Sequence, residues 1–138
     1  MGRILAIDYG RKRSGIAVSD PLRICANGLP TVRSCDLLTF LQDYCGKETV
    51  DCIVVGLPLT LRGEPSESNR YIDPFIKQLK KAMPEMRIER IDERFTSSIA
   101  HREMALAGLK KSRREEKELA DKTAAVIILT DWLNSHTV

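Results

Sequence analysis

The feature that most constrains the fold is an apolar run without polar alternation, Cys52-Ile53-Val54-Val55, which ends at the turn Gly56-Leu57-Pro58. A strand with one solvated face alternates apolar and polar residues, whereas a strand covered on both faces reads as a continuous apolar run. The run therefore predicts a buried strand that has protein on both of its faces.

The rest of the chain supplies the other elements of such a sheet. Strands are predicted where apolar and β-branched residues cluster, and helices where apolar residues recur every three or four positions. The predicted strands cover residues 3–8, 15–19, 23–33, the run that opens at 51, and 86–92; the predicted helices cover 36–45, 72–83, 96–109 and 119–133. Gly46 is the predicted stop signal of the first helix.

The order of these elements predicts the architecture. The short gap between the first two strands favours an antiparallel hairpin, and strands entered through helical crossovers lie parallel to one another. We therefore predict an α/β fold in which helices flank a mixed sheet, within one domain over residues 1–138.

Composition is typical of a soluble globular protein. The chain has 138 residues, of which 43% are hydrophobic and 30% charged, and no apolar run approaches the about 20 residues that span a membrane. The formal net charge of +3 is compatible with a polyanionic partner but does not require one. The four cysteines form no CxxC pair, which argues against a zinc site and predicts reduced thiols in the cytoplasm.

Acidic residues are predicted to meet at one edge of the sheet. Asp8 ends the first strand, and Asp92 and Glu93 end the last, at the edge where open α/β sheets bind ligands. Asp121 heads an apolar stripe of the last helix. Taken alone, Asp8 could be a polar strand end and Asp121 could complement the positive end of its helix. Together the acids suit Mg²⁺ or Mn²⁺, and two such ions support phosphodiester cleavage.

Positive charge flanks these acids in two runs, which could contact phosphates or could simply face water. The predicted nucleic-acid contacts are Gly10, Arg11, Lys12, Arg13, Gly56, Arg94, Lys110, Lys111, Arg113 and Arg114. The three Tyr, three Phe and one Trp are too few for an extended base-stacking platform, which favours contacts to the backbone of the nucleic acid.

Four motifs in the same order and spacing make the chain resemble the YqgF family, also called the RuvX or pre-16S rRNA nuclease family. They are AIDYGRKRSGIAVSD, IVVGLPLTLRGEPS, IDERFTSS and DKTAAVIILTDWL. The resemblance implies a ribonuclease H-like fold with a five-stranded mixed sheet. It also implies that Asp8, Glu93 and Asp121 are catalytic metal ligands, with Asp92 as a competing candidate for the second position, and that Gly56 belongs to a turn beside the substrate.

The resemblance implies a hydrolase that cuts phosphodiester bonds with Mg²⁺ or Mn²⁺, most simply two ions. The expected substrate is the precursor of 16S ribosomal RNA, cut during maturation of its 5′ end. The alternatives are a Holliday junction resolvase acting on branched DNA and a non-catalytic nucleic-acid-binding module. Monomer and homodimer both remain open, and no membrane association is expected.

Overall fold

The computed structural model describes residues 2–57, 69–92 and 113–135, and for residues 57, 69, 92 and 113–123 it describes the backbone only. In chain order the elements are β1 (Arg3–Asp8), β2 (Arg13–Ser19), β3 (Ala26–Arg33), the 3₁₀ turn η1 (Ser34–Asp36), α1 (Leu37–Lys47), β4 (Val50–Leu57), α2 (Asn69–Ala82), β5 (Arg87–Asp92) and α4 (Arg113–Ser135). None of the described helices is long and apolar enough to cross a membrane.

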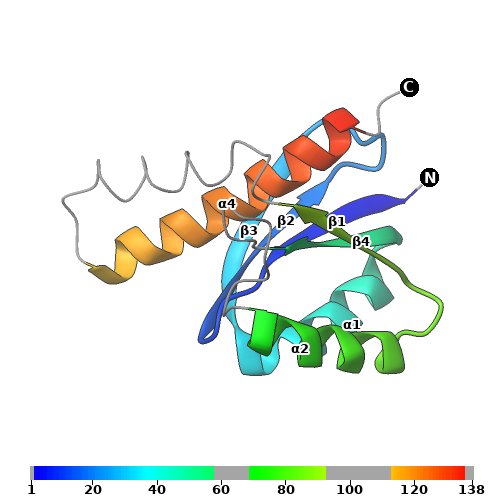
Figure 1. Ribbon diagram of the computed structural model, residues 1–138. Coiled ribbons are helices and arrows are strands. Elements are labelled where there is room, and N and C mark those ends of the chain that lie inside the picture. Colours follow the sequence, from blue (N-terminus) through cyan, green and yellow to red (C-terminus); the bar gives the residue numbers. More distant parts are fainter. Residues whose placement is uncertain (1, 58–68, 93–112, 136–138) are drawn as a thin grey trace.

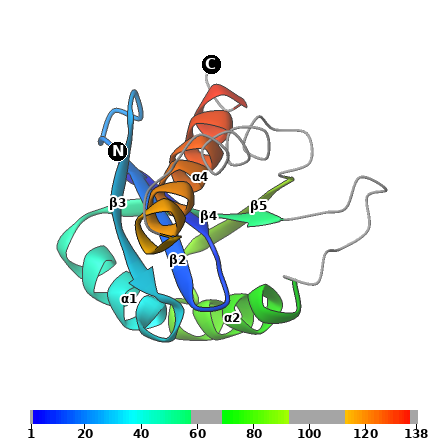
Figure 2. The same cartoon turned by 90° about the vertical axis from the view of Figure 1, so that its left-hand side faces the viewer.

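The described strands form one sheet in the order β3-β2-β1-β4-β5. β1 pairs antiparallel with β2, and β2 pairs antiparallel with β3, whereas β1, β4 and β5 run parallel. The predicted mixed sheet, its hairpin and its parallel strands are therefore confirmed. β1 lies in the centre, between a hairpin partner and a crossover partner (Figure 2).

The sheet lies between two layers of helices. α1 and α2 cover one face, and α4 crosses the other face over β1, β2 and β3 (Figure 1). Side chains of β1 alternate between the two layers: Leu5 and Ile7 pack in the cluster with α1 and α2, and Ile4 and Ala6 pack in the cluster with α4.

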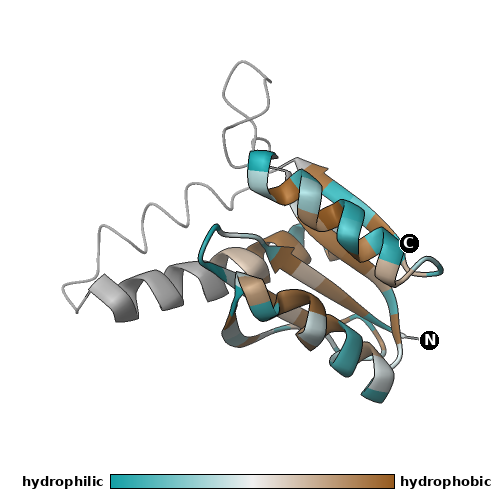
Figure 3. Ribbon diagram, turned by 90° about the horizontal axis from the view of Figure 1, so that it is seen from below, coloured by the Kyte–Doolittle hydropathy of each residue, from teal (hydrophilic) through white to brown (hydrophobic). Residues whose placement is uncertain are grey.

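Residues 52–55 of β4 divide between the two layers in the same way and are all buried, so the predicted strand with two covered faces is confirmed. Most of the strand surface is accordingly brown in Figure 3, whereas α1 and α2 alternate between brown and teal.

The first helix continues beyond its predicted end. Gly46 was expected to stop it, but α1 runs to Lys47, and Glu48 closes it with an extended backbone while its amide donates to the Tyr44 carbonyl. A glycine costs a helix only about 1 kcal/mol relative to alanine, so one in an exposed last turn need not end the helix.

The third strand begins later than predicted, at Ala26 instead of residue 23. The reason is a local turn, in which the Asp20 carboxylate accepts the backbone amides of Ile24 and Cys25 at 2.7 and 2.8 Å. Side chains of aspartate compete in this way with strand pairing for nearby amides.

The last helix begins earlier than predicted, at Arg113 instead of residue 119. Its first turns are rich in Arg, Glu and Lys, which are strong helix formers although they supply no apolar pattern. The predicted helix over 96–109 lies outside the described residues.

Candidate functional site

Asp8 is the last residue of the central strand β1 and is half-buried. It shares its sheet face with Ile4 and Ala6, because residues two apart in a strand point the same way, and that face is the one α4 covers. Its directly opposed partner in β2 is Gly15, a residue without a side chain. Asp8 therefore lies at the end of the sheet and on the face of α4.

The neighbouring parallel strands end beside Asp8. Ile7 pairs with Val55 of β4, and the next residues of β4, Gly56 and Leu57, pair with Ile91 and Asp92 of β5. The carboxyl ends of β1, β4 and β5 thus form one edge, as the sequence predicted. The backbone of Asp92 is at this edge, while Glu93 and Arg94 lie outside the described residues.

The final helix places the position of Asp121 over the same region. α4 runs opposite to β1, so its N-terminal half lies at the end of the sheet where β1 finishes (Figure 1). Position 121 is one helical turn before Ala125, which is fully buried with Ile4 and Ala6 in the cluster under α4. It is also about two turns after the start of the helix at Arg113. Since the helix dipole acts mainly on the first turn, complementing that dipole is a weak reason for an acid here.

The described side chains contain no group of three His, Cys, Asp or Glu residues that could hold a metal ion, and of the predicted acids only Asp8 has a described side chain. The predicted contacts Lys110 and Lys111 lie outside the described residues, and Arg113 and Arg114 are placed by their backbone only, at the start of α4.

The basic turn that follows Asp8 is held rigid by a closed set of hydrogen bonds. The Gly10 amide donates to Ser14 Oγ at 3.3 Å, and Ser34 Oγ donates to the Gly10 carbonyl at 2.5 Å. The Oγ atoms of the two serines are 2.9 Å apart. Because the Ser34 hydroxyl donates its single proton to the Gly10 carbonyl, it accepts the proton of the Ser14 hydroxyl. The Ser34 amide also donates to the Lys12 carbonyl at 2.9 Å.

Gly10 is required by this arrangement. A Cβ built on it would lie 2.2 Å from the backbone carbonyl oxygen of Arg13, much closer than any real contact. The sequence analysis named Gly10 as a nucleic-acid contact, but it did not predict the serines that lock the turn. The locked turn exposes the side chains of Arg11 and Lys12 at the same end of the sheet as Asp8, with Arg13 half-buried.

Arg90 was not predicted from the sequence as part of the site, but it supports the end of β4. Its Nη2 donates to the Gly56 carbonyl at 3.1 Å and its Nε to the Val55 carbonyl at 3.3 Å, while Nη1 lies 3.6 Å from Asp73 Oδ1 of α2. The guanidinium thus ties the end of β4 to α2. Gly56 was predicted to lie in the turn that ends this strand, but β4 continues to Leu57 and Gly56 still pairs with Ile91 of β5 at the carboxyl edge of the sheet.

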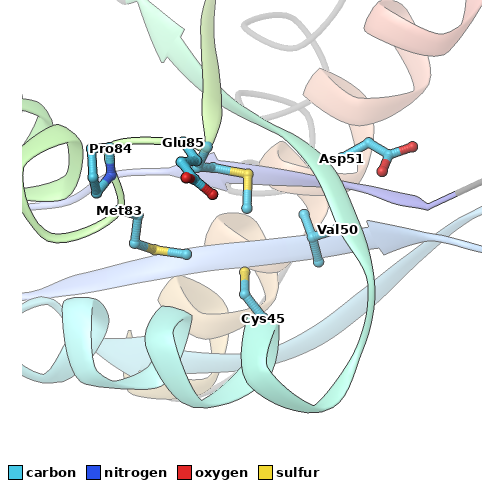
Figure 4. Close-up of a pocket in the computed structure, with 7 residues that line it drawn as sticks. Cys45, Val50, Asp51, Met83, Pro84 and Glu85 are labelled. Atoms are coloured by element: carbon cyan, nitrogen blue, oxygen red, sulfur yellow. The ribbon is translucent and has the colours of Figure 1, made fainter.

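A groove opens at the opposite edge of the sheet. It has a volume of about 520 Å³ and is lined by Cys45, Val50, Asp51, Met83, Pro84, Glu85 and Met86. Figure 4 shows Cys45, Met83 and Val50 around the hollow. Burial raises the pKa of the Cys45 thiol above its ordinary value. Val50 and Asp51 begin β4, so this groove is remote from Asp8 and separate from the predicted acidic site.

Sequence relatives match nearly the whole chain. A protein of Bacteroides thetaiotaomicron named "Putative pre-16S rRNA nuclease" is 53% identical over 135 residues, which cover 98% of both chains. Relatives with the same name are 51% identical in Porphyromonas gingivalis (98% of both chains) and 48% identical in Flavobacterium psychrophilum (96% of this chain and 97% of the relative).

Solved structures confirm the fold. The structure of Thermus thermophilus RuvC in complex with a Holliday junction substrate aligns with a TM-score of 0.62 at 16% identity, covering 99% of this chain and 98% of that one. A second RuvC structure from T. thermophilus aligns at 0.57 and 14% identity, covering 98% and 97%. The predicted ribonuclease H-like fold is therefore correct. The sequence profile described as "RuvX: Holliday junction resolvase" matches residues 2–135, and the chain belongs to the RuvX family.

Proposed function

We propose that this member of the RuvX family is a metal-dependent nuclease that cuts the precursor of 16S ribosomal RNA and matures its 5′ end. The observation that carries the proposal is the position of Asp8, half-buried at the end of the central strand and on the sheet face that α4 covers. Full-length relatives at 48–53% identity carry the name of a pre-16S rRNA nuclease, which supports the choice of substrate. A ribosomal RNA substrate also implies the cytoplasm as the compartment.

We assign three acids to the site, Asp8, Glu93 and Asp121. Position 121 is one turn before Ala125, which packs with Ile4 and Ala6 on the Asp8 face. For the second acid we favour Glu93 over Asp92, as the resemblance to the family implies.

This donor set suits Mg²⁺ or Mn²⁺, which prefer hard carboxylate oxygens. Asp8, Glu93 and Asp121 would hold the ions, and two ions fit the chemistry best. When bound, such ions make a water molecule more acidic and offset the charge that develops on the leaving oxygen.

The chain's own contribution is to position the RNA strand. The locked turn after β1 exposes the cationic side chains of Arg11 and Lys12 beside the strand end that carries Asp8, where they can contact phosphates on either side of the cut. Gly56 offers no side chain that would obstruct the strand, and Arg90 fixes its carbonyl.

The test is the Asp8→Asn variant, which keeps the shape of the side chain but removes its charge. Purified protein with Mg²⁺ or Mn²⁺ should cut a 16S precursor fragment, and Asp8→Asn should bind that RNA without cutting it. Asp43→Asn is the matched control, because Asp43 is exposed on α1 and forms an ion pair with Lys47 at 3.2 Å, within the same helix. In cells, only the Asp8→Asn variant should accumulate extended 16S 5′ ends.

Mature 5′ ends in cells that carry Asp8→Asn would contradict the rRNA proposal. The family description favours one other substrate, a Holliday junction, so a four-way DNA junction belongs in the same assay. Cleavage of the junction by the natural protein, lost in Asp8→Asn, would then identify a resolvase. Cleavage of neither substrate would leave a nucleic-acid-binding module without catalysis.

A further inference from the structure

The turn after β1 is joined to α2 by two stacked contacts. Tyr9 stacks on Phe75, with ring centroids 4.9 Å apart and an interplanar angle of 28°. Two residues further along the turn, Arg11 Cζ lies 5.2 Å from the centre of the Tyr71 ring. Tyr71 and Phe75 are one helical turn apart, so they form one stripe of α2 that faces the turn.

The two contacts differ in exposure. Phe75 is 4% exposed and Tyr9 is half-buried, so the inner contact belongs to the core. Tyr71 is 43% exposed, and Arg11 is exposed as well. Core packing therefore accounts for the inner contact but does not account for a large aromatic ring and a guanidinium held together at the surface.

The outer contact lies close to the proposed catalytic edge. Arg11 is three residues after Asp8, so their Cα atoms are at most about 11 Å apart, a distance that a few nucleotides span. Strand alternation puts Asp8 on the α4 face and Tyr9 on the α2 face. A nucleic-acid strand that passes Asp8 and crosses the edge of the sheet would next meet the pair formed by Arg11 and Tyr71. Lys12 and Arg70 are exposed nearby in the sequence and can contact its phosphates.

We propose that Arg11 and Tyr71 form a stacking subsite for one unpaired base of the RNA strand that flanks the cleaved phosphate. The inference deepens the proposed nuclease function and rests on it. Tyrosine rings and arginine guanidinium planes stack on any base, because every base offers a π-face. Bases inside a duplex already stack on one another, so the subsite selects a single-stranded flank. One subsite is compatible with the small number of aromatic residues, which argues only against an extended platform.

Binding can test this without cleavage. In the Asp8→Asn background and without divalent metal, Tyr71→Leu should bind a short single-stranded RNA roughly 5- to 150-fold more weakly, the range for loss of one base stack. Tyr71→Phe, which keeps the ring, is the matched control and should bind within about twofold of the parent. A duplex of the same sequence should bind all three proteins equally.

The salt dependence separates stacking from charge. Tyr71→Leu should leave the slope of log K against log salt unchanged, whereas Lys12→Ala should reduce it by about 0.7, the value for one phosphate contact on a single strand. An RNA with an abasic site at the stacked position should bind the parent and Tyr71→Leu equally.

Equal binding of single-stranded RNA by the parent and Tyr71→Leu, at unchanged thermal stability, would overturn the subsite. Equal weakening on single-stranded RNA and on duplex would overturn it too, because no stacking preference would remain. Neither result depends on cleavage, so failure of the subsite is distinct from failure of the nuclease proposal, which the Asp8→Asn cleavage assay decides.

Discussion

The buried pair of serines under the basic turn allows a quantitative prediction. Ser34 is 8% exposed and Ser14 is fully buried, and the hydrogen bonds of the pair run from the Gly10 amide through both hydroxyls to the Gly10 carbonyl. Ser34→Ala removes the donor to that carbonyl and the acceptor of the Ser14 proton. Leaving buried polar groups without partners costs about 1–3 kcal/mol, so we expect the free energy of unfolding to fall by about 2 kcal/mol.

The double variant distinguishes a coupled pair from two separate hydrogen bonds. Ser14→Ala alone should cost a similar amount, because it leaves the Gly10 amide without its acceptor. Each single variant breaks the bond between the hydroxyls, whereas the double variant loses that bond only once. The cost of Ser14→Ala with Ser34→Ala should therefore be smaller than the sum of the single costs by about 1 kcal/mol.

Urea unfolding followed by far-ultraviolet circular dichroism measures these free energies, with equal m-values as the condition for comparing them. Ser135→Ala is the control, since that hydroxyl donates to the Asp131 carbonyl on an exposed helix end and its loss should change stability by less than about 0.5 kcal/mol. Single variants that cost nothing, or a double variant equal to the sum, would refute the hydrogen-bonded pair.

Two further predictions concern the opposite edge and the thiols. A backbone hydrogen bond from Gly2 holds the pKa of Asp51 below its ordinary value of 3.8, so the carboxylate stabilises the folded state above that value and loses this effect as the pH falls through the lowered pKa. Asp51→Asn should therefore lower the melting temperature near pH 7, this difference should shrink as the pH falls below 3.8, and a pH-independent difference would contradict this. Burial raises the pKa of Cys52 to about 12, whereas Cys25 and Cys35 are exposed. Mass spectrometry after brief alkylation of native protein at about pH 8 should find label on the two exposed thiols and none on Cys52, and equal labelling would disprove the burial argument.

The fold could be predicted because its main determinants are local in the sequence. The run over 52–55 is apolar at every position, and this indicates a strand covered on both faces without knowledge of what covers it. Helix ends were predicted less well, because apolar periodicity does not mark a helical turn that is made of charged residues. The first turns of α4 carry charged helix formers and no apolar residue of the stripe, so periodicity placed the start six residues late, at 119 instead of 113.

The residues of the candidate site could likewise be predicted only where their position follows from the local sequence and the order of the elements. Asp8 could be assigned to the carboxyl edge of the sheet because a strand end and a parallel topology follow from the order of the elements. Ser34 and Arg90 could not be predicted, because their partners Gly10 and Gly56 are 24 and 34 residues away in the chain. Such contacts depend on strand register and on side-chain reach, neither of which a single sequence shows.

Strand alternation at the end of β1 puts neighbouring residues on opposite faces of the sheet and so separates the two proposed tasks. Asp8 belongs to the face of α4, with position 121, whereas Tyr9 belongs to the face of α2 and leads to the Arg11–Tyr71 contact. Changes on the α4 face should therefore act on the chemical step, and changes on the α2 face should act on the binding of the strand that flanks the cut. Because the serine-locked turn is short and rigid, it keeps these two surfaces at a fixed separation. A variant that loosens the turn should therefore weaken an activity that needs both surfaces more than an activity that needs only one of them.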